Sequence, residues 1–263
     1  MSFIEDLKKL QGFKKAYIQR LEGQFVNDAS FYYWNGLKSL KIPIEFFDED
    51  KKYDINLDRE TLVVAGVPTT IKVFETLGIK IPKPLDIPEE LVSFCGRRVE
   101  ITTIREAIKK TKQDFPLFVK PSEHGKLFNG QTVSGVEELE LFRYCSEEFD
   151  LDLPVLISEP VNFISEYRSF VLEGKILDSR RYMGDFKIFP DFSIIEKAVS
   201  SYTKSPIAYA IDFGVTDDGR TLLVECNDAY SLGPYGFDNF NLTRMFIMRW
   251  KELLADKLIF TNR

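Results

Sequence analysis

Two carboxylates and an amide in the last third of the chain have the types and spacing of a metal site. Asp212 and Glu225 lie in two apolar segments that are separated by the pair Asp218-Gly219. Such a pair is a strong hairpin signal, because a type I′ turn needs positive φ at both central residues. With this pair as the turn, Asp212 lies directly across from Glu225, and Asn227 shares their face of the sheet.

The two faces of this hairpin carry different residues, and only one of them is a core face. The apolar face consists of Tyr209, Ile211, Phe213, Val215, Leu222, Val224 and Cys226, and the acids share their face with Ala208, Ala210, Gly214 and Leu223. Like charges directly opposite each other destabilise a sheet, so the two carboxylates need a neutralising partner. Such oxygen ligands suit Mg²⁺ that is also bound by substrate phosphates. The alternative is an ordinary solvated hairpin face, against which the small neighbours weigh.

A lysine at the end of an apolar segment is a candidate for phosphate binding. The segment 117–120 ends on Lys120 and is stopped by Pro121, and the segment 122–130 that follows contains two glycines and small polar residues. Backbone N–H groups of such a loop can bind phosphates, and a lysine at the strand end can contact them as a point charge. A plain exit of the strand to solvent is the alternative interpretation.

A second hairpin is predicted around the pair Glu173-Gly174. With this pair as the turn, Glu166 lies across from Arg181, Arg168 lies on the same face, and Arg180 points to the other face. Taken alone, this arrangement is a surface ion pair, which contributes little to stability.

The elements that position these residues follow from hydrophobic periodicity. Helices are predicted over 3–21, 69–77, 102–112, 137–149 and 240–258, and strands over 42–47, 61–65, 117–120 and 155–158. The alternation of strands and helices, followed by antiparallel hairpins, predicts an α/β front part and an α+β remainder. Prolines at 82, 84 and 88 mark the best candidate boundary between the two.

Composition excludes several function classes. The 263 residues have a net charge of −6 and are 44% hydrophobic, so they lack the basic field that drives non-specific binding of nucleic acids or anionic membranes. No apolar stretch has the roughly 18–20 residues that a membrane span needs, and the first ten residues do not resemble a secretory signal. One histidine gives no basis for a zinc site, and three scattered cysteines give none for a disulfide framework. A cytoplasmic protein is expected.

Taken in chain order, these motifs resemble those of the ATP-grasp superfamily of ATP-dependent carboxylate–amine ligases. The resemblance extends from Lys72 to Tyr235. It rests on Phe118-Val-Lys-Pro121, on Ser158-Glu-Pro-Val161 with Glu166 after it, and on Asp212 with Glu225-Cys-Asn227. The stretches 166–168 and 225–235 look most like a phage and bacterial clade that is marked by two arginines and a lysine.

The resemblance implies the ATP-grasp fold, in which two α+β subdomains grip ATP between antiparallel sheets. A short α/β region, residues 1–82, would precede them. The lid subdomain would then comprise residues 83–158, and the C-terminal subdomain, with the metal site and the terminal helix, residues 159–263.

The resemblance also implies a role for each matched position. The nucleotide would be contacted by Lys72 and Lys120 at its α- and β-phosphates, by Lys126 in a mobile loop, by the Glu159 carbonyl and the Val161 N–H at adenine, and by Glu166 at the ribose. Mg²⁺ would be bound by Asp212, Glu225 and Asn227, and the transferring phosphoryl group by Arg168, Arg181 and Lys187. Many members carry an arginine where this chain has Ala210. Gly233, Tyr235 and Gly236 would either meet the acceptor or form a tight turn.

The function expected from this resemblance is that of an ATP- and Mg²⁺-dependent ligase that forms a C–N bond through an acyl phosphate. A small molecule, an amino acid or a peptide would be its substrate. A kinase that phosphorylates a hydroxyl group and a non-catalytic ATP-binding module are the alternatives. The sequence leaves the substrates and the oligomeric state open.

Overall fold

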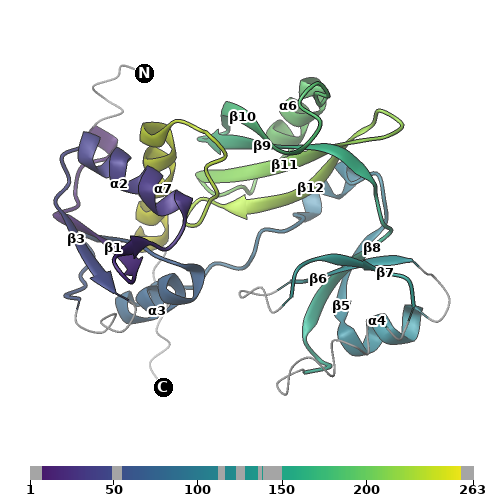
Figure 1. Cartoon of the computed structure of the whole chain (residues 1–263), viewed down its shortest axis with the longest axis horizontal. Helices are drawn as coiled ribbons and strands as arrows, with labels where there is room; N and C mark the ends of the chain where they lie inside the picture. Colours follow the sequence, from purple (N-terminus) through teal and green to yellow (C-terminus); the bar gives the residue numbers. More distant parts are fainter. Residues whose placement is uncertain are drawn as a thin grey trace.

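Three four-stranded sheets form the framework of the protein. The computed structural model describes residues 8–48, 55–111, 116–122, 128–135, 138 and 150–255. The three sheets are well separated in Figure 1, where the N-terminal elements lie at one end of the molecule and the sheet of residues 99–158 lies at the other.

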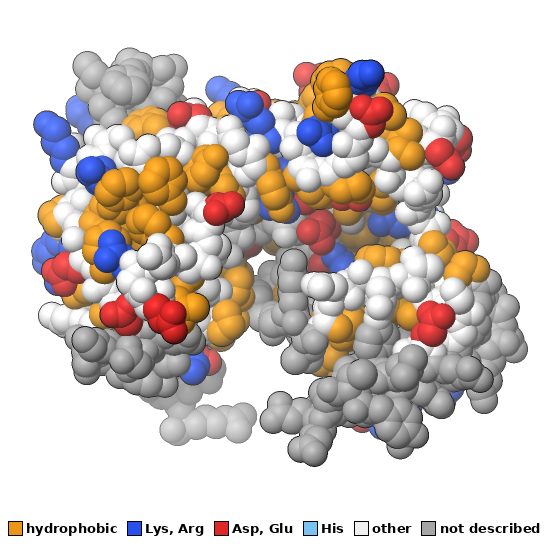
Figure 2. All heavy atoms as spheres, viewed as in Figure 1, with side chains coloured by type: hydrophobic (Ala, Val, Ile, Leu, Met, Phe, Trp, Pro, Cys, Tyr) orange, Lys and Arg blue, Asp and Glu red, His pale blue; other side chains and the backbone are white. Residues whose placement is uncertain are grey.

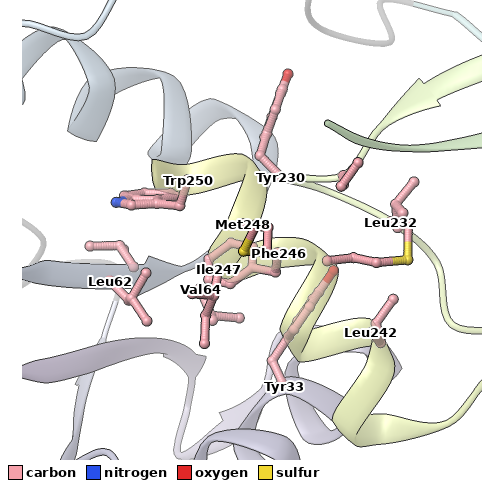
Figure 3. Packing of buried hydrophobic residues seen from close by; sticks show 14 of the residues in the cluster. Tyr33, Leu62, Val64, Tyr230, Leu232, Leu242, Phe246, Ile247, Met248 and Trp250 are labelled. Atoms are coloured by element: carbon pink, nitrogen blue, oxygen red, sulfur yellow. The ribbon is translucent and has the colours of Figure 1, made fainter. Parts of the chain in front are cut away.

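The N-terminal sheet contains β1 (Lys15–Leu21), β2 (Gln24–Phe25), β3 (Ile44–Asp48) and β4 (Thr61–Val64). Strand β1 lies between β3 and β4 and is parallel to both. The sheet packs with α2 (Asp28–Ser39), α3 (Val67–Leu77) and α7 (Asn239–Ala255). Helix α7 comes from the far end of the chain, yet Phe246 and Trp250 lie in the same core as Leu62 and Val64 (Figure 3).

Two features of this region differ from the sequence-based expectation. The predicted helix over 3–21 is wrong, because residues Lys15–Leu21 form β1. The residues from Ala16 to Gln19 are all buried, and a strand that is buried on both faces lacks the alternation that identifies strands. Helix α2 was not predicted. By contrast, α3 is confirmed, and Gly78 ends it with φ of 64°.

The second sheet contains β5 (Val99–Thr103), β6 (Leu117–Pro121), β7 (Gln131–Val133) and β8 (Pro154–Ser158), all antiparallel in the order β5-β8-β6-β7. We call it the lid sheet. Helix α4 (Ile104–Thr111) packs on it through Ile104 and Ala107. It is shorter than predicted because Thr102 and Thr103 pair with β8 instead. The predicted helix over 137–149 lies outside the described residues, apart from residue 138.

The third sheet is antiparallel, in the order β10-β9-β11-β12, and we call it the C-terminal sheet. Its strands are β9 (Phe163–Leu172), β10 (Lys175–Gly184), β11 (Ala208–Thr216) and β12 (Thr221–Asp228). One face packs against α6 (Phe192–Ser201) and the 3₁₀ helix η2 (Glu89–Phe94). On the opposite face, Ala208 and Ala210 pack with residues of α7.

The hairpin β11–β12 confirms the predicted pairing of Asp212 with Glu225, although its turn differs. The loop has three residues, because the Thr216 N–H bonds to the Arg220 carbonyl and Gly219 has φ of 84°. A bulge next to Asp212, which leaves Val224 without a register partner, then restores the predicted register. Leu223 consequently lies on the core face across from Phe213, which was predicted for Val224.

Two bulges in β10 change the register of the second hairpin. The turn at Glu173-Gly174 is confirmed, but Arg168 pairs with Arg180 and Glu166 pairs with Met183. The predicted pairing of Glu166 with Arg181 is therefore wrong, because bulges leave no local sequence signal that an expected register could use. Arg180, not Arg181, shares the register position of Arg168.

Gly214 lies close to the ring of Phe163, where a Cβ atom would overlap the ring carbons. We expect Gly214→Ala to lower the melting temperature by several degrees, because overpacking costs about 1–3 kcal/mol and each kcal/mol corresponds to about 2–4 °C in a chain of this size. Thermal unfolding followed by circular dichroism checks this. Phe163→Ala in the same chain should restore most of the loss, and an unchanged melting temperature in the single variant would contradict the overlap.

Candidate metal and phosphate site

An open cavity of about 710 Å³ brings together residues from distant parts of the chain. Its walls are formed by the first turn of α3, the linker before η2, the acidic face of the C-terminal sheet and the loop after β12. Lining residues include Val67, Lys83, Asp86, Arg168, Tyr182, Asp212, Glu225, Asn227, Asp228, Tyr230 and Tyr235. Figure 2 shows acidic and basic side chains in the hollow between the two large lobes.

Asp212 is fully buried and forms a bidentate ion pair with Arg168. The distances are 2.9 Å from Nε to Oδ1 and 2.6 Å from Nη2 to Oδ2. The two residues are register partners on β11 and β9, so the sheet itself aligns them. Burial raises the pKa of Asp212 to about 6, although Arg168 opposes the shift. The first carboxylate of the predicted metal site therefore already has a cation beside it.

Glu225 has a different cation. Its Oε2 accepts a hydrogen bond from Nζ of Lys120 at 2.8 Å, and the same nitrogen lies 2.8 Å from Oδ1 of Asp86. Burial would raise the pKa of Glu225, but the ion pair with Lys120 outweighs it and holds the pKa below its ordinary value. The repulsion expected between the opposed carboxylates is thus relieved by one protein cation on each, which the sequence alone did not indicate.

Asn227 joins the two carboxylates. Its Nδ2 donates to Oδ2 of Asp212 at 3.2 Å and to Oε1 of Glu225 at 3.0 Å. The three side chains therefore converge on one point, and their oxygen donors fit Mg²⁺ that is also bound by phosphates. Among the described residues, no cluster of three or more His, Cys, Asp or Glu side chains could hold a metal ion without such help.

An aromatic pair covers Arg168 on the cavity side. The rings of Tyr182 and Tyr235 stack with centroids 4.9 Å apart, and the Arg168 guanidinium lies 5.0 Å from the centre of the Tyr235 ring. The Tyr182 hydroxyl donates to Glu166, and burial raises the pKa of that carboxyl group. Sequence reasoning missed Tyr182, because the bulge beside it alters the face that it would otherwise occupy.

The predicted hinge residues lie where the lid sheet continues into the C-terminal sheet. The Glu159 carbonyl accepts from the Ser158 hydroxyl at 3.1 Å, and the Glu159 carboxylate accepts from the Arg98 N–H at 2.9 Å. Val161 follows and is half-buried. Their contact with adenine stays a prediction.

The structure does not bring every predicted cation to the cavity. Lys72 is exposed on α3, and the cavity is lined there by Val67 and Pro68 instead. Arg181 is exposed and donates to the Gly184 carbonyl at 2.6 Å. Lys187 is also exposed, 5.7 Å from the centre of the Phe186 ring. Lys126 lies outside the described residues. Of the predicted cations in the described part of the chain, Lys120 and Arg168 reach the carboxylates.

Asp228 is a second acidic residue that sequence reasoning missed. It lines the cavity and forms a buried bidentate pair with Arg249 of α7, at 2.8 Å and 2.7 Å. Its partner lies on another element, so no local spacing could have revealed the pair. The contact fixes the end of β12, immediately after Asn227, against the C-terminal helix.

Membrane insertion through a helix finds no support in the described part of the chain, where no helix has both the length and the apolar character to cross a bilayer.

A family model described as an ATP-grasp domain, family 2 of its clade, matches residues 94–245, which is more than half of the chain. The matched region includes Lys120, Arg168, Asp212, Glu225 and Asn227. None of the curated protein sequences compared with the chain matches it.

Solved structures show the same fold at low sequence identity. A D-alanine–D-alanine ligase from Bacillus anthracis is 17% identical with a TM-score of 0.55, covering 91% of this chain and 98% of its own. The D-cycloserine synthetase DcsG is 10% identical with a TM-score of 0.58, covering 90% and 99%. A RimK-domain ATP-grasp protein from Sphaerobacter thermophilus is 14% identical with a TM-score of 0.54, covering 88% and 99%.

Proposed function

The chain belongs to this ATP-grasp domain family, and from this premise we propose that it is an ATP- and Mg²⁺-dependent ligase that joins a carboxylate to an amine. The observation that carries the proposal is the convergence of Asp212, Glu225 and Asn227, with Lys120 and Arg168 beside them, on one cavity wall. The similarity to structures of ligases supports the same interpretation.

The proposed reaction has two steps. The γ-phosphoryl group of ATP passes to a substrate carboxylate, which gives an acyl phosphate and ADP. The amine then attacks the acyl carbon, an amide bond forms, and orthophosphate leaves with the electrons of the broken C–O bond. No protein nucleophile is needed in either step, so positioning and electrostatic stabilisation account for catalysis.

The chain's own residues have distinct tasks in this proposal. Lys120 contacts the α- and β-phosphates, and Arg168 keeps Asp212 ionised and oriented. Bound Mg²⁺, held by Asp212, Glu225 and Asn227, supplies positive charge to the phosphates. Adenine would lie at the hinge 159–161, and Glu166 would hold the ribose.

The finer placement is part of the same proposal. We assign the lid subdomain to residues 83–158 and the C-terminal subdomain to 159–263, and the bounds of the two sheets support this division. Membership of a phage and bacterial clade with two arginines and a lysine is supported by the stretches 166–168 and 225–235. An amino acid, a peptide or another small molecule is the proposed substrate class.

The test is an ADP-release assay with Mg²⁺ and ATP over a panel of carboxylates and amines. We expect release that requires one carboxylate and one amine together, with one orthophosphate formed per amide. Release with a hydroxyl acceptor and no amine would identify a kinase instead. Nucleotide binding without any release over the panel would support a binding module, although the intact set of Lys120, Asp212, Glu225 and Asn227 favours catalysis.

A further inference from the structure

Asp86 is an acidic residue of the cavity wall that lies outside the region matched by the family model. It belongs to the linker between α3 and η2, and its side chain is 17% exposed. Its Oδ1 lies 2.8 Å from Nζ of Lys120, the same distance at which Lys120 contacts Glu225. Lys120 therefore has two anionic partners, of which only Glu225 was expected to belong to the site.

The backbone fixes Asp86 independently of its side chain. The Asp86 carbonyl accepts from the Cys226 N–H at 2.6 Å, which joins the linker to the outer edge of β12. Leu85 and Ile87 on either side pack against the core beneath the C-terminal sheet. The φ angle of Asp86 is 42°, in the left-handed region that glycine occupies without strain. A carboxylate kept at a strained position indicates a use for its side chain.

We propose that Asp86 is a positioning residue that holds the Lys120 ammonium in the orientation required to contact nucleotide phosphates. The inference rests on the proposed function, in which Lys120 binds phosphate. An ammonium group has three N–H donors, and two carboxylates occupy two of them, so one remains for a phosphate oxygen. Once Glu225 binds Mg²⁺, Asp86 is the anion that stays with Lys120. A Lys–Glu ion pair serves the same purpose in protein kinases.

Asp86→Gly and Asp86→Asn test this proposal. Glycine relaxes the backbone and keeps the carbonyl bond to Cys226, whereas asparagine keeps an oxygen acceptor without the charge. The Mg²⁺ complex of the non-hydrolysable analogue AMP-PNP is titrated into each protein by calorimetry. We expect a Kd at least about tenfold higher for Asp86→Gly, because a hydrogen bond to a charged group is lost, and an intermediate value for Asp86→Asn.

Two further measurements separate positioning from a general structural role. Adenosine has no phosphate, so its affinity should be the same for wild type and Asp86→Gly. In a Lys120→Met background, Asp86→Gly should leave the Kd for AMP-PNP unchanged, because the effect passes through Lys120. A structural role of Asp86 would weaken adenosine as well and would persist without Lys120.

Each outcome decides the proposal. Equal or tighter binding of AMP-PNP by Asp86→Gly overturns it, and so does a parallel loss of adenosine binding. If the wild-type chain binds AMP-PNP and the Asp86 variants bind it equally well, the positioning role alone is rejected and the proposed function stands. If the wild-type chain binds no nucleotide with Mg²⁺, both are overturned.

Discussion

Glu225→Gln is expected to abolish Mg²⁺-dependent ATP turnover and to leave the metal-free protein folded. The substitution removes a ligand charge with almost no change in shape. Because even residues that only support metal ligands cost about 10–100-fold when they are mutated, we expect turnover to fall by more than about a hundredfold. ADP release with saturating Mg²⁺ and ATP measures the loss.

The stability of the metal-free variant follows from the partners of Lys120. Lys120 keeps Asp86 at 2.8 Å when the Glu225 charge is removed, and the glutamine oxygen still accepts a hydrogen bond from it. The melting temperature in EDTA should therefore change by no more than about 2–4 °C, which corresponds to about 1 kcal/mol. A much larger decrease would show that the pair of Lys120 and Glu225 holds the lid sheet to the C-terminal sheet as part of the fold.

Glu45→Gln is the matched control. Glu45 is also ion-paired, with Lys15 at 3.0 Å, but it lies on the N-terminal sheet and its side chain is 55% exposed. We expect no change in turnover or melting temperature, since exposed pairs contribute about 0–1 kcal/mol. Turnover retained in Glu225→Gln and equal to that of the control would remove Glu225 from the proposed metal site.

The pairing of Asp212 with Glu225 could be predicted because the information is local. An Asp-Gly pair sets the turn, alternation sets the faces, and small neighbours single out the acids. The prediction nevertheless reached the right pair through the wrong turn, because a three-residue loop and the bulge at Val224 compensate for each other. In the second hairpin the bulges have no such compensation at Glu166, and the predicted register there was wrong.

The cations of the site could not be assigned to their partners, because those partners lie far away in the sequence. Lys120 reaches Glu225 from another sheet, and Asp86 reaches Lys120 from a linker with no motif. Strand β1 was missed for a different reason, since a strand buried on both faces has a pattern much like that of a buried helix. Local pattern predicted the acidic residues and their strands, whereas the charge balance of the site depends on tertiary structure.

Arg168→Met is expected to destabilise the protein more than any surface charge substitution. The change leaves Asp212 buried without its counter-charge, since Asp212 is 0% exposed and Arg168 is 6% exposed. Breaking a buried pair from one side costs about 3–5 kcal/mol, which corresponds to a decrease in melting temperature of about 6–20 °C. Asp212→Asn in the same chain should restore most of this, because the unpaired charge is then gone. Thermal unfolding in EDTA measures both.

The loss in Arg168→Met should depend on pH with a defined sign. The pKa of Asp212 is raised by burial from 3.8 to about 6, so the stability linked to its protonated form is complete below 3.8 and is lost as pH rises through 6. Without Arg168, which lowers this pKa, the folded variant holds the proton to a still higher pH. The deficit relative to wild type should therefore be largest at pH 8 and shrink at pH 5, where Asp212 is neutral in the variant.

Arg180→Met is the matched control for this prediction. Arg180 is the register partner of Arg168 on β10, but its side chain is 44% exposed and pairs with Asp178. Its removal should shift the melting temperature by no more than about 2 °C at either pH, because exposed pairs contribute about 0–1 kcal/mol. An equal loss for Arg168→Met at pH 8 and pH 5, or no recovery with Asp212→Asn, would show that Arg168 stabilises the sheet by packing its side chain and not by neutralising Asp212.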